Sequence, residues 1–506
     1  MSKLYITTSI PYVNAAPHVG FLLELVQADA IARFGRLIGR DVHFQTGTDE
    51  NATKNALAAA ALNLPTAELV ERNSECFRRL LGAFDISADG FIRTTEPRHA
   101  RGVHALWRRL RPGDVYRGTY RGLYCVGCED FLSPRDLVDG RCPDHVDPPV
   151  QTCEDNYFFR LSAYQEQLER LLSEGRIRVV PPARLNEVLS FVRRGLEDIS
   201  ISRSTERARG WGIRVPGDDA HVVYVWIDAL VNYISGLGFG SDDRWGQWWG
   251  DDVTKLHVIG KNVWKFHAIY WPALLLSAGL PLPDAIAVHG FVTAEGRKIG
   301  KSLGNAVDPF ELAGQVGSDA VRYYLLRSIP PFDDGDVSQA RLREVYNADL
   351  ANGLGNLVAR VTTLSRKAGY QPTGLPGATR GPGAAGQPCT SGTVRPSPGA
   401  SDGQSAVLDA PDGYTAAMEG FRFDQAVASL WRIVDRLNVE VERVRPWELL
   451  KAPDPAPLHA HLRRWTLELA RLAHWLSPLL PRTAQRIRER LSGEDPDQTP
   501  LFPRLP

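Results

Sequence analysis

The chain has little of what would place it outside a cell or in a membrane. Six cysteines in 506 residues are too few for the disulfide framework of a small secreted protein. The N-terminus has no basic region followed by an apolar core, which argues against a secretion signal. The apolar run near residues 270–282 is too short and too interrupted by proline to span a bilayer. The sequence therefore predicts a cytoplasmic protein with no membrane partner.

The chain also lacks an excess of charge of either sign. Lys plus Arg and Asp plus Glu each number 59, so the composition predicts no polyanion partner, and any RNA-binding surface has to be a local patch. Hydrophobic residues make up 43% of the chain and charged residues 23%, as in ordinary globular proteins. A chain of this length can hold several domains with more than one core.

The first part of the chain alternates strand-like and helix-like patterns. Residues 3–9 form a β-like run, residues 22–37 carry apolar side chains at the helical period, and residues 41–49 alternate before a Gly-Thr-Asp turn. Strands alternating with helices predict an α/β fold built on a doubly wound parallel sheet. Ligands bind at the carboxyl ends of such strands, where we expect residues 9–14 and 46–49 to meet.

The pattern changes near residue 115 and again near residue 338, which suggests an insertion and a separate helical domain. Sheet-like signals return at residues 221–234 and 255–276, and long amphipathic helices follow residue 345. Residues 371–413 are rich in Gly, Pro, Ala and Ser, which predicts a disordered surface loop. The predicted segments are residues 1–115 (first half of a nucleotide-binding domain), 116–220 (insertion), 221–295 (second half), 296–345 (lysine-containing loop region) and 346–506 (all-α helical bundle).

Two pairs of residues inside the insertion have the spacing of a zinc site. Cys125 and Cys128 are separated by two residues, as are Cys142 and His145. Two such knuckles can converge on one tetrahedral Zn²⁺, and four protein ligands leave no open position for catalysis. We therefore predict one structural zinc ion per chain. The alternative is four unrelated residues in a loop.

Two distant segments contain the residue types of an anion site. His18 and Gly20 lie where a helix begins, and helix-start amides favour phosphate. Lys298, Lys301 and Ser302 lie in a glycine-containing loop. Taken separately, a histidine near a helix start is more often a cap or packing residue, and the loop reads as a solvated basic segment. Together the two segments predict a clamp for a triphosphate.

Over nearly its whole length the chain resembles the methionyl-tRNA synthetases, which are class I aminoacyl-tRNA synthetases. The stretch "PYVNAAPHVGF" is similar to their His-Ile-Gly-His signature, and "KIGKS" is similar to their Lys-Met-Ser-Lys-Ser signature. The zinc knuckle and the blocks "YVWIDAL" and "NADLANGLGNL" are more particular to this family. The resemblance implies that the carboxylate of L-methionine attacks ATP bound with Mg²⁺, and that the methionyl group then passes to tRNA(Met) for translation initiation and elongation.

The resemblance also implies roles for individual residues. The catalytic residues would be His18, Lys298 and Lys301. The ATP-binding residues would be His18, Gly20, Phe21, Gly260, Lys261, Asn262, Lys301 and Ser302. The methionine-binding residues would be Ile10, Tyr12, Asp49, Trp226, Ala229, Tyr233 and His289. Asn356, Arg360 and Trp447 would read the anticodon, and residues 296–345 would include the contact with the tRNA stem. As bare sequence, the aromatic residues read as core, and Asn356 with Arg360 as a solvent-facing pair on one helix.

Three positions depart from the family pattern. Phe21 stands at the second signature histidine, Asn51-Ala52 replaces the usual His-Gly, and Gly300 replaces the first signature serine. Losing one hydrogen bond to a charged phosphate costs about 1.5 to 3 kcal/mol, which slows an enzyme without silencing it. We therefore expect a working enzyme with an altered ATP site.

Two alternatives follow from these departures. The first is a specialised paralogue that tolerates an inhibitor or charges a methionine-like metabolite. The second is a catalytically weak tRNA-binding pseudoenzyme. Branched-chain synthetases are disfavoured, because the insertion is shorter than their editing domain and holds the zinc knuckle. The chain stops soon after "PLFPRLP", without the β-barrel that some relatives use to dimerise, so we expect a monomer.

Overall fold

The computed structural model describes residues 2–125, 129–132, 137–142, 148–298, 307–373, 375, 408–494 and 499–506. The chain divides into two compact units, Met1–Ser338 and Gln339–Pro506, called unit 1 and unit 2 below. Most of the loop predicted at residues 371–413 lies outside the described residues, as do Lys301 and Ser302.

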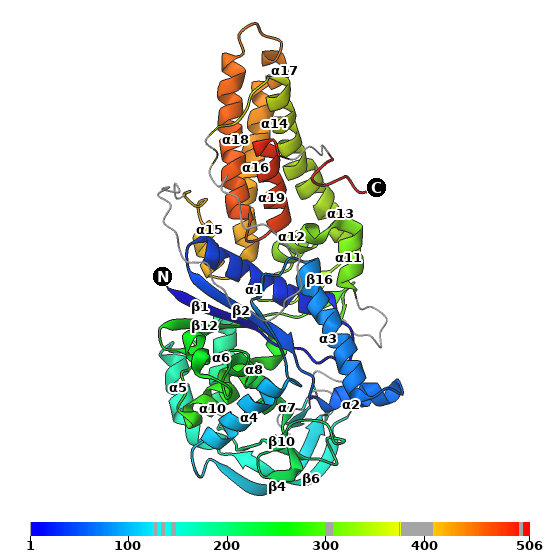
Figure 1. Cartoon of the computed structure of the whole chain (residues 1–506), viewed down its shortest axis with the longest axis vertical. Helices are drawn as coiled ribbons and strands as arrows, with labels where there is room; N and C mark the ends of the chain where they lie inside the picture. The colour runs from blue at the N-terminus through cyan, green and yellow to red at the C-terminus, as the bar shows by residue number, and fades with distance from the viewer. Residues whose placement is uncertain are drawn as a thin grey trace. The chain divides into compact units, whose positions relative to one another are not determined.

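A six-stranded parallel sheet forms the centre of unit 1 (Figure 1). Its strand order is β3-β2-β1-β12-β13-β7, and every neighbouring pair is parallel. The strands are β1 (Lys3–Thr8), β2 (Asp41–Thr48), β3 (Gly90–Arg93), β7 (Arg178–Val180), β12 (Val253–Gly260) and β13 (Ala285–His289). The chain runs outward from β1 to β2 and β3 in one direction and from β12 to β13 in the other, and β7, which precedes β12 in the chain, forms the edge beyond β13. The point between β1 and β12 is a topological switch point, so the predicted doubly wound α/β fold is confirmed.

Helices cover both faces of this sheet, as Figure 1 shows. Helix α1 (Val19–Leu37) connects β1 to β2 and packs against both strands, while α10 (Trp271–Ala278) connects β12 to β13 beside α4 (Pro97–Arg109). Right-handed crossovers that run outward in opposite directions place their helices on opposite faces. Of the apolar side chains predicted to face the core from α1, Leu37 is only partly buried, and the others are buried: Leu22, Leu25, Val26, Ala30 and Phe34. The neighbouring helices are α2 (Thr53–Ala61), α3 (Thr66–Ala83), α7 (Val225–Leu230), α8 (Asn232–Ser235) and α9 (Gly246–Trp249).

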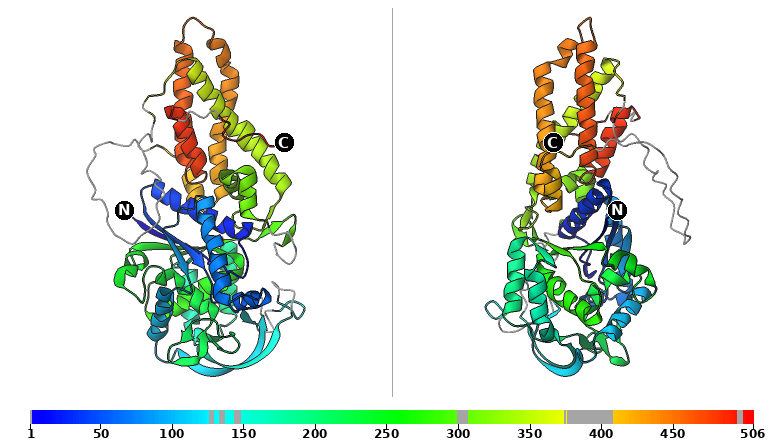
Figure 2. Two further views of the ribbon diagram at one scale, coloured as in Figure 1. Left: turned by 45° about the vertical axis from the view of Figure 1, so that its right-hand side comes forward. Right: turned by 90° about the vertical axis from the view of Figure 1, so that its left-hand side faces the viewer.

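The segment between the two halves builds a second, antiparallel sheet. Its strand order is β5-β4-β6-β8, drawn in cyan at the foot of Figures 1 and 2. The strands are β4 (Val115–Cys125), β5 (Asp130–Leu132), β6 (Val150–Phe159) and β8 (Ile199–Ser200), and helices α5 (Gln165–Ser173) and α6 (Pro182–Arg193) follow β6. Strand β7 from the same segment returns to the parallel sheet beside β13. The segment is therefore fastened to the main sheet at its edge.

Two small sheets complete unit 1. The first contains β9 (Ser202–Ser204), β10 (Arg214–Val215) and β11 (Asp218–Val223), and the second contains β14 (Val292–Ala294), β15 (Arg297–Lys298) and β16 (Gly335–Val337). Helices α11 (Pro309–Val316) and α12 (Ser318–Ser328) lie between β15 and β16 in the chain. Strand β15 leads into the lysine-containing loop, and α11 follows it.

The two sheet-like stretches of the second half are only partly strands, so this expectation was wrong in part. In residues 221–234 the strand ends at Val223, and α7 and α8 follow. In residues 255–276 the strand ends at Gly260, and a π-helical segment at Phe266–Tyr270 leads into α10. A continuous apolar run has no period that separates a buried strand from a buried helix, which is why the sequence misled here.

Unit 2 consists of helices in the residues that the structure describes. They are α13 (Gln339–Val345), a π-helical segment (Tyr346–Gly355), α14 (Asn356–Lys367), α15 (Tyr414–Glu419), α16 (Phe423–Val444), α17 (Pro446–Leu449), α18 (Ala456–Leu476) and α19 (Pro481–Ser492). Their packed faces bury large side chains such as Trp465 and Tyr414. The all-α region predicted near the C-terminus is confirmed.

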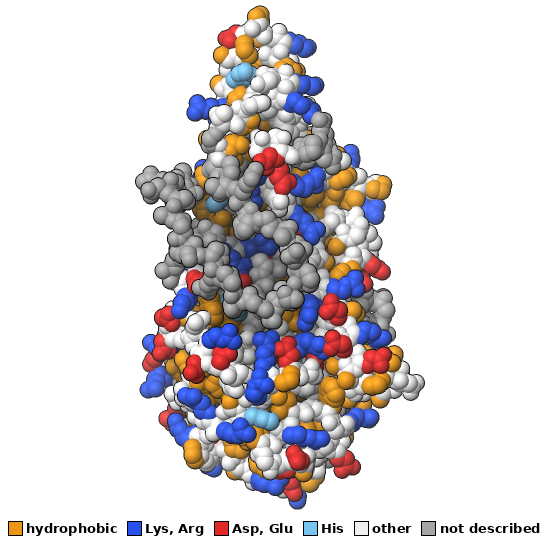
Figure 3. Space-filling model, in the orientation of Figure 1, with side chains coloured by type: hydrophobic (Ala, Val, Ile, Leu, Met, Phe, Trp, Pro, Cys, Tyr) orange, Lys and Arg blue, Asp and Glu red, His pale blue; other side chains and the backbone are white. Residues whose placement is uncertain are grey.

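The surface reflects the balanced composition. Basic and acidic side chains are interspersed over the lower part of the face drawn in Figure 3, with no extended area of one sign. Among the described helices, none combines the length and the apolar composition needed to cross a bilayer.

Candidate active site

Two loops meet at the carboxyl ends of β1 and β2. The Asp49 backbone N–H donates a hydrogen bond to the Pro11 carbonyl at 2.8 Å, and Tyr12 and Asp49 form a parallel β-bridge. On the other side of β1, the Ser9 N–H donates to the Val258 carbonyl at 3.2 Å. The expectation that residues 9–14 and 46–49 meet at the carboxyl ends of the strands is therefore confirmed.

Asp49 is a buried carboxylate with few hydrogen-bond donors to balance its negative charge. Its side chain is 1% exposed and accepts a hydrogen bond from the Asn51 N–H at 3.3 Å. Burial, followed by the charges of Asp228 and Glu129, raises the pKa of Asp49 well above its ordinary value. Within the described part of the chain no arginine or lysine forms an ion pair with it. A cationic ligand group at this point would supply the positive charge that the described side chains around Asp49 do not.

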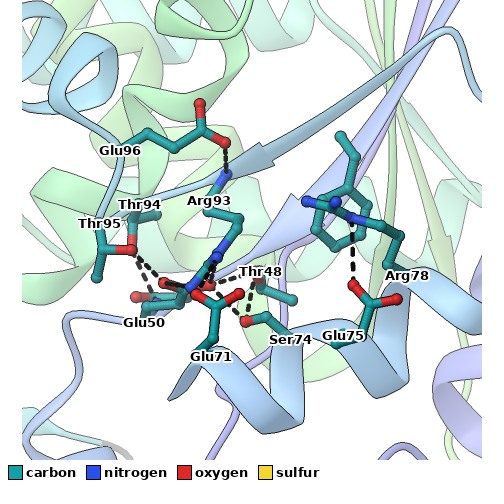
Figure 4. Close-up of polar contacts among 12 residues, drawn as sticks. Thr48, Glu50, Glu71, Ser74, Glu75, Arg78, Arg93, Thr94, Thr95 and Glu96 are labelled. Carbon is teal, nitrogen blue, oxygen red and sulfur yellow. Dashed lines mark hydrogen bonds and ion pairs between the residues drawn. The ribbon is translucent and has the colours of Figure 1, made fainter. Parts of the chain in front are cut away.

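The negative charge of the next residue, Glu50, is balanced by an arginine and several hydroxyl donors (Figure 4). Arg93 donates to its two oxygens at 2.6 and 3.1 Å, and the hydroxyls of Thr48, Ser74 and Thr95 donate as well. The Glu50 N–H donates to the Thr94 hydroxyl at 2.8 Å. These contacts join the ends of β2 and β3 to α3, so they fix the backbone that carries Asp49.

The departure at Asn51 and Ala52 has a structural explanation. The Asn51 amide donates to the Thr94 carbonyl at 3.0 Å and to Asp228 at 2.8 Å. Ala52 precedes α2 and offers no side-chain cap, but the Glu129 carboxylate accepts from the Lys54 N–H at 2.7 Å. Burial raises the pKa of Glu129 to about 7. The insertion that carries Glu129 thus supports the first turn of α2, next to Asp49.

Three aromatic side chains lie together beside this edge of the sheet and are called the aromatic wall below: Tyr12, Trp226 and Phe266. The Trp226 ring stacks on Phe266 with centroids 3.8 Å apart and 5° between the planes, and the Tyr12 ring lies 5.9 Å from Trp226. Ala229 is 5% exposed on the same short helix as Trp226, and Ile10 is half-buried in the loop after β1. Four residues predicted from the family resemblance therefore lie at the carboxyl ends of the strands or on the helix beside them.

The polar atoms of Tyr233 and His289 are engaged by other side chains. The Tyr233 hydroxyl lies 2.5 Å from His267 Nε2, and His289 Nε2 lies 2.9 Å from a Glu24 oxygen. The other Glu24 oxygen accepts from the Ser9 hydroxyl at 2.7 Å. Burial, followed by the charge of Glu24, raises the pKa of Tyr233. Glu24 therefore contacts His289 directly and contributes to the raised pKa of Tyr233.

Phe266, His267 and Glu24 were missed in the sequence. The signal for Glu24 is a lone carboxylate within the apolar run "FLLELV", and the signal for His267 is a polar residue within "FHAIYWPALLL". A charged or polar side chain inside an apolar pattern is buried with a partner, because an unpaired one costs too much.

His18 caps α1. Its Nδ1 accepts a hydrogen bond from the Gly20 N–H at 3.1 Å, so the neutral ring carries its proton on Nε2. The first helical N–H, that of Val19, donates to the carbonyl of Val307 at 3.1 Å. Val307 lies directly after the lysine-containing loop, so the end of that loop is fastened to the helix start. Lys298 pairs with Thr293 through the β15 and β14 backbones, while the structures of Lys301 and Ser302 lie outside the described residues.

Phe21 faces a hydrophobic cluster with Val13, Val70 and Phe77. Its ring meets Phe77 edge to face, with centroids 5.1 Å apart. The residue at the second signature position thus packs against α3 and the loop after β1.

The segment after β12 is only partly open to solvent. The ammonium of Lys261 pairs with Asp334 at 2.7 Å and lies 4.4 Å from the Phe291 ring centroid. Asn262 is exposed, and a side chain at Gly260 would approach His289 within 3.5 Å. The three residues lie at the carboxyl end of β12, next to the switch point.

Two of the four predicted zinc ligands lie together. Cys125 and Cys142 are 2% and 4% exposed and share a small cluster with Leu132. Cys128 and His145 lie outside the described residues, and no group of three ligands occurs among the described ones. A pair of buried thiols in one cluster fits a thiolate-binding metal such as zinc.

In unit 2, the predicted anticodon residues lie near one end of α14 and at α17. The Arg360 guanidinium is 5.9 Å from the Trp447 ring centroid and pairs with Glu442 at 2.7 Å. Asn356 is exposed one turn before Arg360 on α14. Trp447 is 41% exposed, which is high for so large an apolar side chain.

Known proteins resemble the chain along its whole length. Residues 4–148 and 145–362 match the family model described as "tRNA synthetases class I (M)". The chain is 39% identical over 502 residues to a "Methionine--tRNA ligase" of Brucella suis biovar 1 (strain 1330), covering 97% of this chain and 92% of that protein. It is 42% identical over 514 residues to the protein of that name from Mycobacterium bovis, covering 98% and 93%.

Solved structures agree with these relatives. The chain matches Mycobacterium tuberculosis methionyl-tRNA synthetase in complex with methionyl-adenylate with a TM-score of 0.84 and 37% identity, covering 100% of both chains. It matches the apo form of that protein with a TM-score of 0.78 and 35% identity, covering 100% of this chain and 99% of the other.

Proposed function

The chain belongs to the class I methionyl-tRNA synthetase family, and on that basis we propose that it activates L-methionine with ATP and transfers the methionyl group to tRNA(Met). The full-length similarity to methionine–tRNA ligases carries the assignment. The site contributes one decisive observation, which is a buried and uncompensated Asp49 beside an aromatic wall. An amino acid with an apolar side chain fits this arrangement, because its ammonium group can meet the carboxylate while its side chain lies against the aromatic rings.

The amino acid binds through two different interactions in this proposal. Its α-ammonium pairs with Asp49, whose desolvated carboxylate gains a counter-ion. Its thioether tail lies among Ile10, Tyr12, Trp226, Ala229, Tyr233 and His289. Sulfur–aromatic contact and shape hold such a flexible apolar chain. The stacking of Trp226 on Phe266, with the Tyr12 ring 5.9 Å from Trp226, supports this mode.

ATP binds at the start of α1 in this proposal. The Nε2–H of His18 donates to phosphate oxygens at this helix start, with Gly20, Phe21, Gly260, Lys261 and Asn262 on the nucleotide side. Mg²⁺ accompanying ATP neutralises phosphate charge. Lys298, Lys301 and Ser302 close over the phosphates, which the fastening of Val307 to Val19 supports.

The chemical step needs positioning rather than a covalent intermediate. An oxygen of the methionine carboxylate attacks the α-phosphorus, and the bond to the bridging oxygen of the β-phosphate breaks. The electron pair leaves with pyrophosphate, and the product is methionyl-adenylate. Donors on His18 and the lysines stabilise the charge that develops on the phosphates.

The knuckle residues hold one structural Zn²⁺ in this proposal, with Cys125, Cys128, Cys142 and His145 as its ligands. The ion cross-links the hairpin that positions Glu129 against α2. Metal analysis of the purified protein is expected to find one zinc per chain. The variant Cys142→Ser is expected to lose the metal and melt at a lower temperature, whereas an unchanged zinc content would contradict the ligand set.

Unit 2 recognises the anticodon in this proposal. Trp447 stacks on a base, while Asn356 and Arg360 hydrogen-bond to base edges, which is how proteins read unstacked RNA bases. The exposed Trp447 ring beside Arg360 supports this role.

ATP–pyrophosphate exchange with a panel of amino acids tests the proposed function. Methionine is expected to support exchange, and tRNA(Met) is expected to become charged. Exchange with a methionine-like metabolite in place of methionine would point to the specialised paralogue. Binding of tRNA without exchange at any ATP concentration would point to a pseudoenzyme and overturn the proposal.

A further inference from the structure

One residue of the proposed ATP site, Lys261, forms an ion pair with a carboxylate from a distant part of the chain. Its ammonium lies 2.7 Å from the Asp334 carboxylate and 4.4 Å from the centroid of the Phe291 ring. The Lys261 side chain is 23% exposed and the Asp334 side chain is 51% exposed. Asp334 comes from the segment between α12 and β16, and neither the family signatures nor the relatives' names give it a role.

The Asp334 carboxylate is held in place by the backbone of β14 and of the residue before it. One of its oxygens accepts a hydrogen bond from the Phe291 N–H at 2.8 Å. The next residue, Gly335, donates its N–H to the Phe291 carbonyl at 2.9 Å and pairs with Val292 in the parallel ladder of β14 and β16. Although burial alone would raise it, the pKa of Asp334 is lowered by the hydrogen bonds from Lys261 and Phe291. The carboxylate is therefore charged at neutral pH and fixed relative to β14.

The ion pair adjoins the start of α1. Val292, which directly follows Phe291, faces Gly20, because a side-chain carbon at Gly20 would lie 3.8 Å from the Val292 Cβ. Lys261 directly follows β12. The pair is therefore next to both segments of the proposed ATP site, which are the helix start with His18 and the carboxyl end of β12.

We propose that Asp334 is a positioning residue for ATP, which holds the Lys261 ammonium where it meets the phosphates. The inference rests on the proposed function. An ammonium group has three N–H donors, so one can remain on Asp334 while the others bind phosphate oxygens. A free lysine side chain has many rotamers, and one that is already fixed by a carboxylate and a ring face loses less freedom when ATP binds.

The variant Asp334→Asn tests the inference, because the amide keeps the size of the side chain and removes its charge. ATP–pyrophosphate exchange is measured over a range of ATP concentrations at saturating methionine. The KM for ATP is expected to rise by about two- to fivefold, whereas kcat and the KM for methionine are expected to stay at the wild-type values. The matched control is Asp333→Asn at the neighbouring exposed aspartate, which is expected to leave all three constants unchanged.

A double-mutant cycle separates positioning from a general effect of charge or damage. Lys261→Met is expected to raise the KM for ATP by about tenfold or more, because a hydrogen bond to a charged phosphate is lost. Adding Asp334→Asn to Lys261→Met is expected to cause no further rise, since Asp334 acts through the lysine. An equal rise in both backgrounds overturns the inference. A lower KM for ATP in Asp334→Asn also overturns it, because Asp334 would then compete with phosphate for the ammonium.

Calorimetric titration of each protein with ATP decides the matter if exchange by a variant is too slow to follow. The affinity for ATP is expected to fall in Asp334→Asn, and equal affinity in this variant and wild type overturns the inference. Wild-type protein that fails to exchange with methionine overturns the proposed function. Normal wild-type exchange with an unchanged KM for ATP in Asp334→Asn overturns this inference alone.

Discussion

Asp49 and Glu50 are neighbours in the chain, yet their carboxylates meet opposite surroundings. Glu50 accepts from Arg93 and three hydroxyls, while Asp49 accepts from one backbone N–H and faces other carboxylates. A protein keeps an uncompensated buried carboxylate at a cost in stability, which function can offset by binding a cation there.

Replacing Asp49 by Asn is expected to lower activity and raise stability. Loss of the ion pair with the α-ammonium should cost about 1.5 to 3 kcal/mol, so kcat/KM for methionine in exchange should fall by at least about tenfold. The KM for ATP should change little. The matched acid-to-amide control is Glu75→Gln on the exposed face of α3, which should leave exchange unchanged. Equal methionine kinetics in Asp49→Asn and wild type would contradict the assignment of Asp49.

The stability gain of Asp49→Asn should depend on pH. Because the folded state raises the pKa of Asp49 above 3.8, the unfolded chain releases this proton first as the pH rises. The wild type therefore loses stability between 3.8 and the raised value, and keeps that deficit above it. Urea unfolding of the ligand-free protein should show no difference between the two proteins well below pH 3.8 and a more stable variant at pH 7. A less stable variant at pH 7 would contradict this account.

Phe21 is expected to contribute packing rather than catalysis. Phe21→His should retain ATP–pyrophosphate exchange with methionine, because His18 and its Nε2–H remain. It should lower the free energy of unfolding by about 1 to 3 kcal/mol, because a polar ring enters the cluster with Phe77. Phe21→Leu keeps the site apolar and should cost less. Abolished exchange in a folded Phe21→His protein would show that the ring acts in the ATP site.

At the scale of elements, the site depends on how strand ends and helix starts are fastened together. Glu50 joins β2, α3 and β3, Glu24 joins α1 to the ends of β1 and β13, and Val307 joins the lysine-containing loop to α1. Buried pairs of this kind are costly to break, because the remaining partner keeps its desolvation penalty.

Arg93 offers a matched comparison of a buried and an exposed partner. It pairs with Glu50, which is buried, and with Glu71, whose side chain is 69% exposed. Glu50→Gln should lower the free energy of unfolding by about 3 kcal/mol and raise the KM for methionine by loosening Asp49. Glu71→Gln should change stability by less than about 1 kcal/mol. Urea denaturation measures both, and equal losses would contradict the importance given to the Glu50 contacts.

At the scale of the whole molecule, the sites proposed for adenylate chemistry and for anticodon reading belong to different units. Unit 1 holds the strand ends, the aromatic wall and the α1 start, while unit 2 holds Asn356, Arg360 and Trp447. Amino-acid activation and tRNA recognition should therefore respond separately to mutation.

Trp447→Ala is expected to reduce tRNA charging and leave exchange unchanged. Loss of a base-stacking platform costs about 1 to 3 kcal/mol, so kcat/KM for tRNA(Met) should fall by about tenfold or more. Trp447→Phe should recover part of the loss. Leu467→Ala, which removes another exposed apolar side chain of unit 2, should have no effect on charging. Equal charging by Trp447→Ala and wild type would contradict the anticodon assignment.

Much of this organisation could be predicted from the sequence, because it rests on local regularities. The helical period of residues 22–37 and the long helical pattern of residues 423–444 each mark side chains that are buried in the structure. The alternation in residues 41–49 identified the strand, although both of its faces are buried from Phe44 to Thr48. Where the signal is one of composition alone, as in residues 221–234, the sequence did not separate strand from helix.

By itself, the sequence determined the α/β and all-α classes, the meeting of the loops after β1 and β2, and the family. These depend on periodicity, on the geometry of parallel sheets and on motifs read in order. Only the tertiary structure decided that Asp29 on α1 is buried against Arg322, that Glu24 meets His289, and that Asp49 has no arginine or lysine partner among the described residues. The charge state and orientation of a side chain depend on groups hundreds of residues away, brought near by folding, and no local pattern encodes them.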